Sequence, residues 1–179
     1  MEEAVLRLNY DECETLLGRI YYALTEKGVC FLSWSPTGWQ DFYGSLENEY
    51  FPEVETGNKI TSEFTAEINS FFKGELKEFS YSIDLLNISP FKKKVLETAY
   101  SIPYGQVRSY GELAMESGYP NAYRAVGSTM RANRISLIVP CHRVVKSDGY
   151  IGGFGGRQDL KRQLLELEGI KVDKNFRYR

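Results

Sequence analysis

The sequence predicts a mixed α/β (α+β) fold: a small N-terminal α/β domain with an antiparallel sheet, then a mostly helical C-terminal domain that contains a helix-turn-helix. Two observations predict it. Strand-like alternation and a hairpin pattern occupy residues 1–85, whereas capped helix starts dominate residues 86–179. The charge also divides the chain, because residues 1–90 carry 6 Lys/Arg and 16 Asp/Glu (sum −10) and residues 91–179 carry 16 and 8 (sum +8). The basic half is suited to a polyanion, unless the asymmetry is chance surface composition.

Composition excludes several classes of protein. At 179 residues, 42% hydrophobic and 26% charged, the chain has a globular composition, outside the disordered range. Its apolar runs are shorter than the ~18 residues of a membrane span, and the acidic N-terminal residues show no signal-peptide pattern. Three cysteines, an odd number, argue against a disulfide framework and for a reducing setting. We therefore expect a cytoplasmic protein without a membrane partner, or a nuclear one if the source is eukaryotic.

The N-terminal domain, residues 1–85, begins with strand patterns. Ala4–Leu8 alternates between apolar and polar residues, and the strand-like runs Gly18–Leu24 and Val29–Ser33 flank a hairpin turn at residues 26–28. Two helices follow. Helical spacing predicts the first from Trp39, Phe42, Tyr43, Leu46 and Tyr50, and the second over Thr61–Phe72. We interpret their aromatic residues as core and this domain as structural.

The C-terminal domain, residues 86–179, is marked by helix caps. Ser89 is the expected cap of a helix over Phe91–Tyr100, with Pro90 at the first helical position. Ser109–Glu112 fits a capping box that opens a short helix. Asn121 is the expected cap of a third helix, which runs to about Arg131.

Two short helices separated by a glycine-containing turn give residues 109–131 the outline of a helix-turn-helix. The second helix surrounds one long cation, Arg124, with small residues such as Ala125 and Gly127. Small side chains allow close approach to a groove, so this composition favours shape-based minor-groove contact over base reading. The alternative interpretation is tight helix packing, with Arg124 a solvated charge.

A cysteine next to the only histidine is the chemical centre of the sequence. The apolar run Ile135–Val139, predicted to be a buried strand, leads into the sequence PCHRV at residues 140–144. A thiolate is a better nucleophile than a thiol, and His142 can take the proton of Cys141 while Arg143 favours the anion.

Other interpretations of this pair remain open. Cys141 can be a small buried hydrophobe, and a Cys/His pair also suits a cysteine hydrolase. A zinc site is disfavoured, because Cys13, Cys30, Cys141 and His142 lack the CxxC or HxxxH spacing of metal ligands. We expect no metal, and the sequence does not decide whether Cys13 and Cys30 form a disulfide.

A glycine-rich loop and a last helix follow the cysteine. Lys146–Gly149 predicts a turn, and Gly152–Gly156 encloses one aromatic residue, Phe154, with spacing that does not match a phosphate-binding motif. Such a loop suits a flat ligand stacked on the ring. The helix Asp159–Glu168 is predicted to bury Leu160, Leu164 and Leu167. A glutamate in its last turn, Glu168, opposes the helix dipole and therefore needs a partner or a task.

These motifs resemble one known family, the O6-alkylguanine-DNA alkyltransferases, also called methylated-DNA–protein-cysteine methyltransferases. The sequence VPCHRVV at residues 139–145 carries the resemblance, together with Ile102–Gly105, Ser109-Tyr110, Arg124–Gly127 and Asn133. The resemblance covers about residues 86–169, whereas the N-terminal half is similar only in outline.

The resemblance implies DNA repair by a single-turnover suicide enzyme. After minor-groove binding and base flipping, the alkyl group of O6-alkylguanine, with O4-alkylthymine as a second candidate, would pass irreversibly and stoichiometrically to the thiolate of Cys141. The implied partner is double-stranded DNA that contains O6-alkylguanine. The protein would act as a monomer without a cofactor.

The resemblance also implies residue roles. Cys141 would be the nucleophile, His142 would deprotonate it through a water, Glu168 would orient the imidazole, Asn133 would brace the segment and Tyr110 would donate a proton to the departing guanine. The implied substrate-binding residues are Tyr110, Met130, Val144, Phe154 and Gly155. The implied DNA-binding residues are Tyr110, Ala125, Gly127 and Arg124, the last filling the stack that the flipped nucleotide leaves.

The sequence departs from the family pattern at a few positions. Phe154 stands where the family often has Tyr or Trp, which preserves stacking, and Gly155 keeps the backbone N–H of the residue it replaces. Ser136 replaces a proline that lines the pocket in some members, so acceptance of bulky adducts is open. A zinc site like that of some members is not expected, because the N-terminal half has two cysteines and no histidine.

Two further functions compete with alkyl transfer. An alkyltransferase-like damage sensor would bind the lesion without chemistry, but such proteins lack the reactive cysteine that Cys141 supplies here. A helix-turn-helix regulator would need a base-reading helix, which the small residues around Arg124 do not provide.

Overall fold

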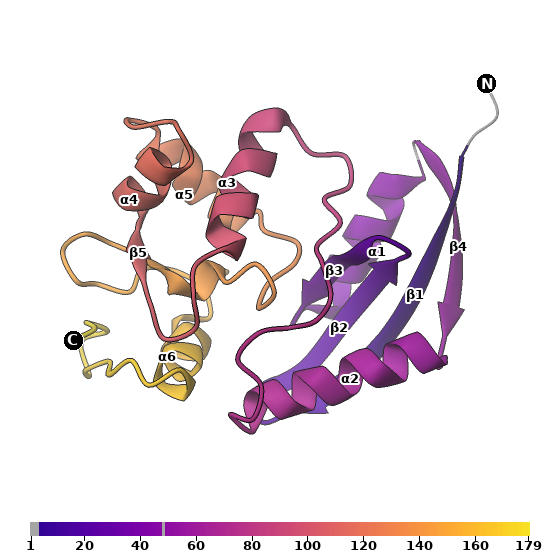
Figure 1. Ribbon diagram of the computed structural model, residues 1–179, viewed down its shortest axis with the longest axis horizontal. Coiled ribbons are helices and arrows are strands. Elements are labelled where there is room, and N and C mark those ends of the chain that lie inside the picture. Colours follow the sequence, from indigo (N-terminus) through magenta and orange to yellow (C-terminus); the bar gives the residue numbers. More distant parts are fainter. Residues whose placement is uncertain (1–3, 48) are drawn as a thin grey trace. The chain divides into compact units, whose positions relative to one another are not determined.

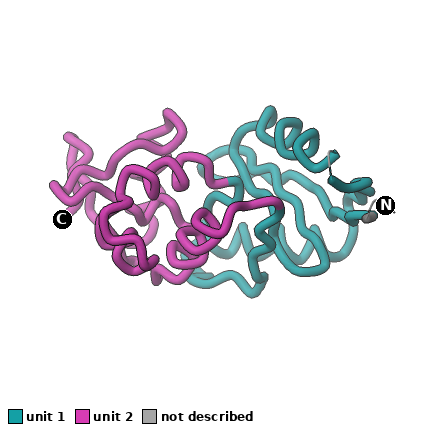
Figure 2. The backbone as a smooth tube through the Cα atoms, turned by 90° about the horizontal axis from the view of Figure 1, so that it is seen from above, with its two compact units in different colours: residues 1–86, 134–138 teal, residues 87–133, 139–179 magenta. Residues whose placement is uncertain are grey.

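The chain forms two compact units in this computed structural model, which describes residues 4–47 and 49–179. The first unit contains the chain up to Leu86 and also the short segment Arg134–Ile138, and the second contains Asn87–Asn133 and Val139–Arg179 (Figure 2). The segment that directly precedes the Pro140-Cys141 sequence therefore belongs to the N-terminal unit.

The first unit is an α/β sandwich of one sheet and two helices (Figure 1). Its elements are β1 (Ala4–Thr15), β2 (Gly18–Thr25), β3 (Gly28–Ser33), α1 (Pro36–Leu46), β4 (Tyr50–Thr56) and α2 (Lys59–Phe72). The sheet order is β3-β2-β1-β4. The predicted hairpin is confirmed, since β2 and β3 pair antiparallel from Thr25 and Gly28 outward.

One strand of the sheet departs from the predicted antiparallel pattern. Tyr50, assigned to the first helix from its spacing, instead begins β4, which pairs parallel to β1 with Tyr50 opposite Ala4. The prediction was wrong because α1 ends at Leu46. Tyr50 lies four residues later, which matches helical spacing only by coincidence. The strands β3 and β4 are the two edges of the sheet, and α1 is the crossover connection between them that places β4 beside β1 in the parallel direction.

Aromatic residues of the two helices contribute to the core of the first unit, as predicted. Phe31 and Phe42 are buried and stack with ring centroids 5.1 Å apart. On α2, Phe64 and Ile68 are fully buried, and its N-cap Asn58 accepts a hydrogen bond from the N–H of Thr61 at 3.1 Å. Burying such large apolar side chains supplies most of the stability of a small unit.

The outer edge of β3 is paired with the segment that leads to the cysteine. Leu32 donates its N–H to Arg134 at 2.8 Å and accepts from the N–H of Ser136 at 3.0 Å. The predicted strand Ile135–Val139 is therefore only partly correct. Pairing is limited to the bridge between Leu32 and Ile135, because Leu137 adopts a φ of 75° and turns the chain.

The second unit is mostly helical (Figure 1). Its elements are α3 (Pro90–Tyr100), β5 (Arg108–Ser109), α4 (Tyr110–Glu116), α5 (Tyr123–Arg131), the 3₁₀ turn η1 (Cys141–Arg143), β6 (Val144–Val145) and α6 (Gln158–Leu167). The short strands β5 and β6 pair in parallel. This pairing holds the start of α4 beside the residues that follow the Cys-His sequence.

Of the three predicted helix caps, Ser89 and Ser109 stand at the N-cap position, and only Ser109 makes the cap hydrogen bonds. Ser109 and Glu112 form the capping box, in which the Ser109 hydroxyl accepts from the N–H of Glu112 at 3.1 Å and the carboxylate accepts from the N–H of Ser109 at 2.7 Å. Ser89 makes no side-chain cap hydrogen bond. Asn121 is not a cap, because its N–H donates to Tyr119 in a turn and Ala122 takes the N-cap position.

Helices α4 and α5 pack together and form the predicted helix-turn-helix. Their connection, residues 117–122, is longer than a turn of three or four residues. Gly118 adopts a φ of 84°, which ends α4, and the turn at Tyr119 follows before α5 begins. The exposed N-terminal half of α5 carries Arg124 and Ala125.

Candidate active site

Cys141 opens a tight 3₁₀ turn between Val139 and Val144. The N–H of Cys141 donates to Val139 at 2.8 Å, and the N–H of Arg143 donates to Pro140 at 2.8 Å. The thiol is 7% exposed and the imidazole of His142 is fully buried. Because the residues lie on a turn and not on a strand, Cys141 and His142 do not have to point to opposite faces.

Asn133 connects the end of α5 to this turn. Its side-chain N–H₂ donates to the carbonyl of Val139 at 3.0 Å and to the sulfur of Cys141 at 3.2 Å. Both bonds come from one amide, so the position of the thiol is coupled to the end of the second helix of the helix-turn-helix. A hydrogen bond donated to sulfur stabilises the thiolate more than the thiol.

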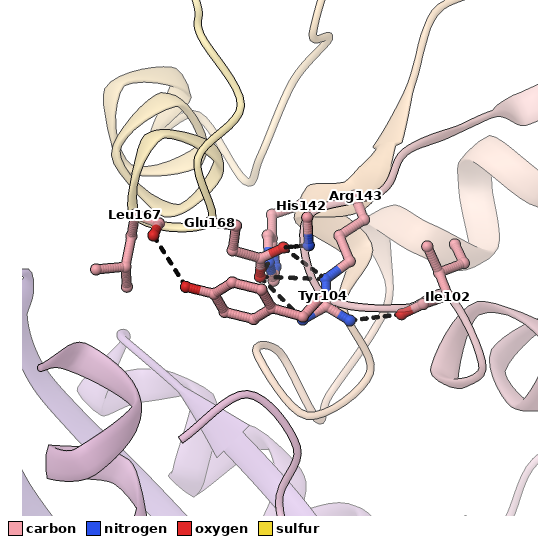
Figure 3. Close-up of polar contacts among 7 residues, drawn as sticks. Ile102, Tyr104, His142, Arg143, Leu167 and Glu168 are labelled. Atoms are coloured by element: carbon pink, nitrogen blue, oxygen red, sulfur yellow. Dashed lines mark hydrogen bonds and ion pairs between the residues drawn. The ribbon is translucent and has the colours of Figure 1, made fainter. Parts of the chain in front are cut away.

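His142 is held by Glu168, the residue that follows α6 (Figure 3). The imidazole Nε2 lies 2.8 Å from the carboxylate Oε1. The same carboxylate accepts from Nε of Arg143 at 2.9 Å and from the backbone N–H of Gly105 at 3.0 Å. The last-turn glutamate that the sequence singled out therefore has its partners, which come from segments far apart in the chain.

Arg143 hydrogen-bonds Glu168 and Ile102. Its guanidinium makes a two-pronged contact with Glu168, and Nη1 donates to the carbonyl of Ile102 at 2.5 Å (Figure 3). A planar guanidinium binds a carboxylate in this geometry. The effect of Arg143 on the thiol stays a prediction, and its partner Glu168, 25 residues further along the chain, was not foreseen.

The buried pair sets the protonation state of the imidazole. Burial alone raises the pKa of Glu168, but the hydrogen bonds and charges of His142 and Arg143 outweigh it and lower that pKa to about 2. Burial lowers the pKa of His142, although Glu168 opposes the shift. At neutral pH a neutral ring therefore donates from Nε2 to a carboxylate, which leaves Nδ1 as the basic nitrogen. This Nδ1 is buried and has no hydrogen-bond partner within residues 4–47 and 49–179.

Tyr110 lies between α5 and the glycine-rich loop. A methyl group on Gly127 would lie 3.9 Å from its ring, and one on Gly152 would lie 3.5 Å from its hydroxyl. Burial raises the pKa of Tyr110, and negative charge on Cys141 raises it further. The hydroxyl therefore stays protonated at neutral pH.

Lys161 is a site residue that the sequence interpretation missed. This α6 residue is fully buried, and its ammonium donates to the carbonyl of Val144 at 2.5 Å. Burial lowers its pKa to about 8, while negative charge on Cys141 raises it. Helical spacing could have identified it, since Lys161 precedes Leu164 and Leu165 by three and four residues on the buried face.

The buried face of α6 also differs at one leucine from the prediction. Leu165 is buried there, and Leu167, predicted to be buried, is only half-buried.

The remaining predicted residues fall into a buried and an exposed set. Met130 is 5% exposed and Val144 is fully buried, whereas Phe154 is half-buried. Arg124 is exposed on α5, where its guanidinium lies 5.6 Å from the ring centroid of Tyr123. Ala125 and Gly155 are also exposed.

The other two cysteines are thiols in the N-terminal unit. Burial raises the pKa of Cys13 to about 11 and also raises that of Cys30. A protonated buried thiol is inert, so these residues do not compete with Cys141 as nucleophiles. In residues 4–47 and 49–179, no helix is both long and apolar enough to cross a membrane.

Known proteins match both the sequence and the fold. The family model of the 6-O-methylguanine DNA methyltransferase DNA-binding domain matches residues 90–170. A methylated-DNA–protein-cysteine methyltransferase of Methanosarcina barkeri is 35% identical over 164 residues, which span 89% of this chain and 96% of the relative. The structure of the Mycobacterium tuberculosis O6-methylguanine methyltransferase has a TM-score of 0.72 at 34% identity, covering 90% of this chain and 92% of that chain. The same bacterium's OGT in complex with DNA has a TM-score of 0.70 at 33% identity, with the same coverage of both chains.

The shared fold, together with a cysteine held between a helix-turn-helix and a histidine–glutamate pair, defines a DNA alkyltransferase. Identity above 30% across nearly the whole length of a relative makes the assignment specific. The chain belongs to the methylated-DNA–protein-cysteine methyltransferase family, as the sequence resemblance implied.

Proposed function

We propose that this protein repairs DNA directly by moving the alkyl group of O6-alkylguanine in double-stranded DNA to Cys141, once per molecule. The observation that carries the proposal is the bond between His142 Nε2 and Glu168, which leaves Nδ1 as a buried base on the residue that follows Cys141. The sulfur forms a bond to the alkyl carbon, the carbon–O6 bond breaks, and its electron pair goes to the guanine. The product is a thioether, which no ordinary base cleaves, so the protein does not turn over.

Activation of the thiol begins at Glu168. The carboxylate fixes the imidazole tautomer, and His142 then takes the Cys141 proton through a bridging water. The resulting imidazolium is stabilised by the same carboxylate. Asn133 donates to the sulfur at 3.2 Å, which lowers the energy of the thiolate as it forms.

The leaving guanine requires a proton, and Tyr110 is the donor. Its raised pKa keeps the hydroxyl protonated at neutral pH, and the ring lies against α5 at Gly127. The base itself would be held by Met130, the carbonyl of Val144, the ring of Phe154 and the backbone N–H of Gly155.

Base flipping is the role proposed for α5. The O6 position is unreachable in a stacked duplex, so the nucleotide must leave the helix. Arg124 is long, cationic and exposed, and its neighbour Ala125 is small and exposed. Tyr110, Ala125 and Gly127 would line the minor groove while Arg124 fills the vacated stack.

All residues of the proposed site belong to the second unit of one chain, so we propose that the protein acts as a monomer. In this division, residues 86–179 carry DNA binding and alkyl transfer, and residues 1–85 are structural. Three thiols suit a reducing, intracellular setting.

The test is intact-mass measurement after incubation with a duplex that contains O6-methylguanine. We expect one added methyl group, mapped to Cys141, with saturation at one equivalent of DNA. Cys141→Ala should add none, and Cys13→Ala, which removes another buried thiol, should behave like the parent protein. Binding of the duplex without any mass change would instead indicate a damage sensor.

A further inference from the structure

Residues 171–179 form a closed hairpin that lies beyond the range matched by the family model, residues 90–170. Val172 and Tyr178 make an antiparallel bridge, and the N–H of Arg179 donates to Lys171 at 3.0 Å. At the tip, the carboxylate of Asp173 accepts from the N–H groups of Asn175 at 2.8 Å and Arg177 at 3.0 Å. The chain end is therefore a defined element with its own hydrogen bonds.

The hairpin is bonded to the segment that follows β6. The N–H of Ile151 donates to Phe176 at 2.9 Å, and the N–H of Tyr178 donates to Gly149 at 3.0 Å. Arg177 adds a side-chain bond, in which Nη1 donates to the carbonyl of Asp148 at 2.5 Å. Three hydrogen bonds thus hold Asp148, Gly149 and Ile151 of this segment.

Apolar packing supports the same contact. Val145, Ile151 and Leu165 are fully buried and form one cluster. Val172, Phe176 and Tyr178 of the hairpin pack against this cluster. Val145 belongs to β6, two residues after Arg143, so the hairpin covers the side of the unit that supports the reactive turn.

The segment fixed by the hairpin leads directly into the loop Gly152–Gly156. Gly152, Gly155 and Gly156 adopt φ values of 81°, 53° and 81°. Glycine has the largest conformational freedom to lose, so a loop rich in it depends on anchors at its ends. At the far end, Arg157 donates its N–H to Phe154 at 2.8 Å. At the near end, Gln158 Nε2 donates to Gly152 at 3.2 Å, next to the Ile151–Phe176 bond.

We propose that the hairpin 171–179 is a positioning element for the loop Gly152–Gly156, and that Phe176 and Arg177 act through Ile151 and Asp148 to set the geometry in which the alkylated base is held. The role of this loop in holding the base rests on the proposed function. Neither residue touches the reacting atoms. Loss of the hairpin contact is expected to loosen the loop and slow transfer from DNA, while the intrinsic reactivity of the thiol is unchanged.

Two full-length variants test the proposal. Phe176→Ala removes the apolar packing against the cluster of Val145, Ile151 and Leu165, and Arg177→Ala removes the side-chain bond to Asp148. Lys174→Ala is the matched control, because Lys174 is an exposed residue of the same hairpin. Its replacement removes one positive charge, as Arg177→Ala does, and so controls for weaker electrostatic attraction to DNA.

The first measurement is amide hydrogen exchange, which does not depend on alkyl transfer. We expect faster exchange at residues 149–156 in Phe176→Ala and Arg177→Ala, with α3 unchanged and with Lys174→Ala like the parent protein. Unchanged exchange in the loop would show that the hairpin does not position it. This result would overturn the proposal even if the protein transfers alkyl groups as proposed.

The second measurement compares two reactions of Cys141. We expect the rate of methyl transfer from an O6-methylguanine duplex to fall about 10- to 100-fold in Phe176→Ala, the range for a misplaced reactant. The rate with iodoacetamide, which needs no base pocket, should stay within about twofold. An equal fall in both rates would indicate general damage to the site and would contradict a positioning role. If both rates stayed at the level of the parent protein, the hairpin would not position the loop. Absence of methyl transfer by the parent protein would instead contradict the proposed function. The hydrogen-exchange result does not depend on that function, so the two outcomes can be told apart.

Discussion

At the scale of single residues, the site depends on one buried carboxylate that serves three donors. Glu168 is 6% exposed and is bonded to His142, Arg143 and Gly105. A buried charge is tolerable only when it is paired and hydrogen-bonded, so the three partners stabilise each other through the same group. The sequence identified Glu168 from its unfavourable place at a helix C-terminus, but not Arg143 as its partner, because no local pattern relates residues 25 positions apart.

Replacing Glu168 with glutamine is expected to lower the free energy of unfolding by about 3–5 kcal/mol, because the Arg143 charge stays buried without a counterion. The transfer rate should fall as well, since the imidazole loses its anionic partner. The control is Glu166→Gln, in the same helix, which affects an exposed pair with Arg162 and should change stability by about 0–1 kcal/mol. Urea unfolding of both variants measures the difference. Equal effects would show that the buried pairing is not stabilising.

Lys161 allows a second residue-level prediction. Its pKa in the folded protein, about 8, lies below the ordinary value of 10.5, because burial disfavours the ammonium. Between these values the unfolded chain binds more protons than the folded one, so the stability contributed at this position rises as pH increases from about 8 to about 10.5. We expect the stability of the parent protein relative to Lys161→Met to rise across this range in urea unfolding. A constant difference would mean that the ammonium is not disfavoured by burial.

At the scale of elements, helix capping separates what local sequence determines from what it does not. The capping box at Ser109 involves residues three apart, and both of its hydrogen bonds form. Ser89 satisfies the same statistical preference without making the bond. Tyr50 shows that local spacing does not predict strand pairing: helical spacing assigned it to α1, whereas it pairs with Ala4, which is far away in the sequence. Local patterns predict where helices begin better than they predict strand partners.

The two serines provide a paired prediction. Ser109→Ala is expected to lower the free energy of unfolding by about 1 kcal/mol, because it leaves the N–H of Glu112 without its acceptor. Ser89→Ala should change it by less than about 0.5 kcal/mol, since no side-chain bond is lost. Both substitutions are the same chemical change at a helix start. Urea unfolding that ranks them in the opposite order would contradict this account of the caps.

At the scale of the whole molecule, the path of the chain explains why the site could be predicted only in part. The second unit contains Cys141, His142, Glu168, Asn133 and Tyr110. Local motifs singled out the first three, whereas the family resemblance supplied Asn133 and the role of Tyr110. The pairing of Leu32 with Arg134 and Ser136 was not predictable, because non-local strand contacts leave no periodic pattern in the sequence. The N-terminal unit contains Arg134–Ile138, between Asn133 and the reactive turn, so the structural role proposed for that unit includes the segment that precedes the cysteine in the chain.

The buried pair of His142 and Glu168 makes the stability of the whole protein depend on pH. His142 is the only histidine, and burial lowers its pKa below the ordinary value of 6.5. As pH falls below 6.5 the unfolded chain takes up a proton that the folded protein does not, so stability falls by up to about 1.4 kcal/mol per pH unit. Below pH 4.5 Glu168 adds to the loss, since its pKa is about 2 in the folded protein. Urea unfolding between pH 7.5 and pH 5 isolates the histidine, because carboxylates remain largely ionised there. We expect a continuous decrease in the parent protein and a smaller one in His142→Gln. A flat profile in the parent protein would mean that burial does not change the pKa of the imidazole, and a stability that rises toward pH 5 would mean that the imidazole is charged in the folded state.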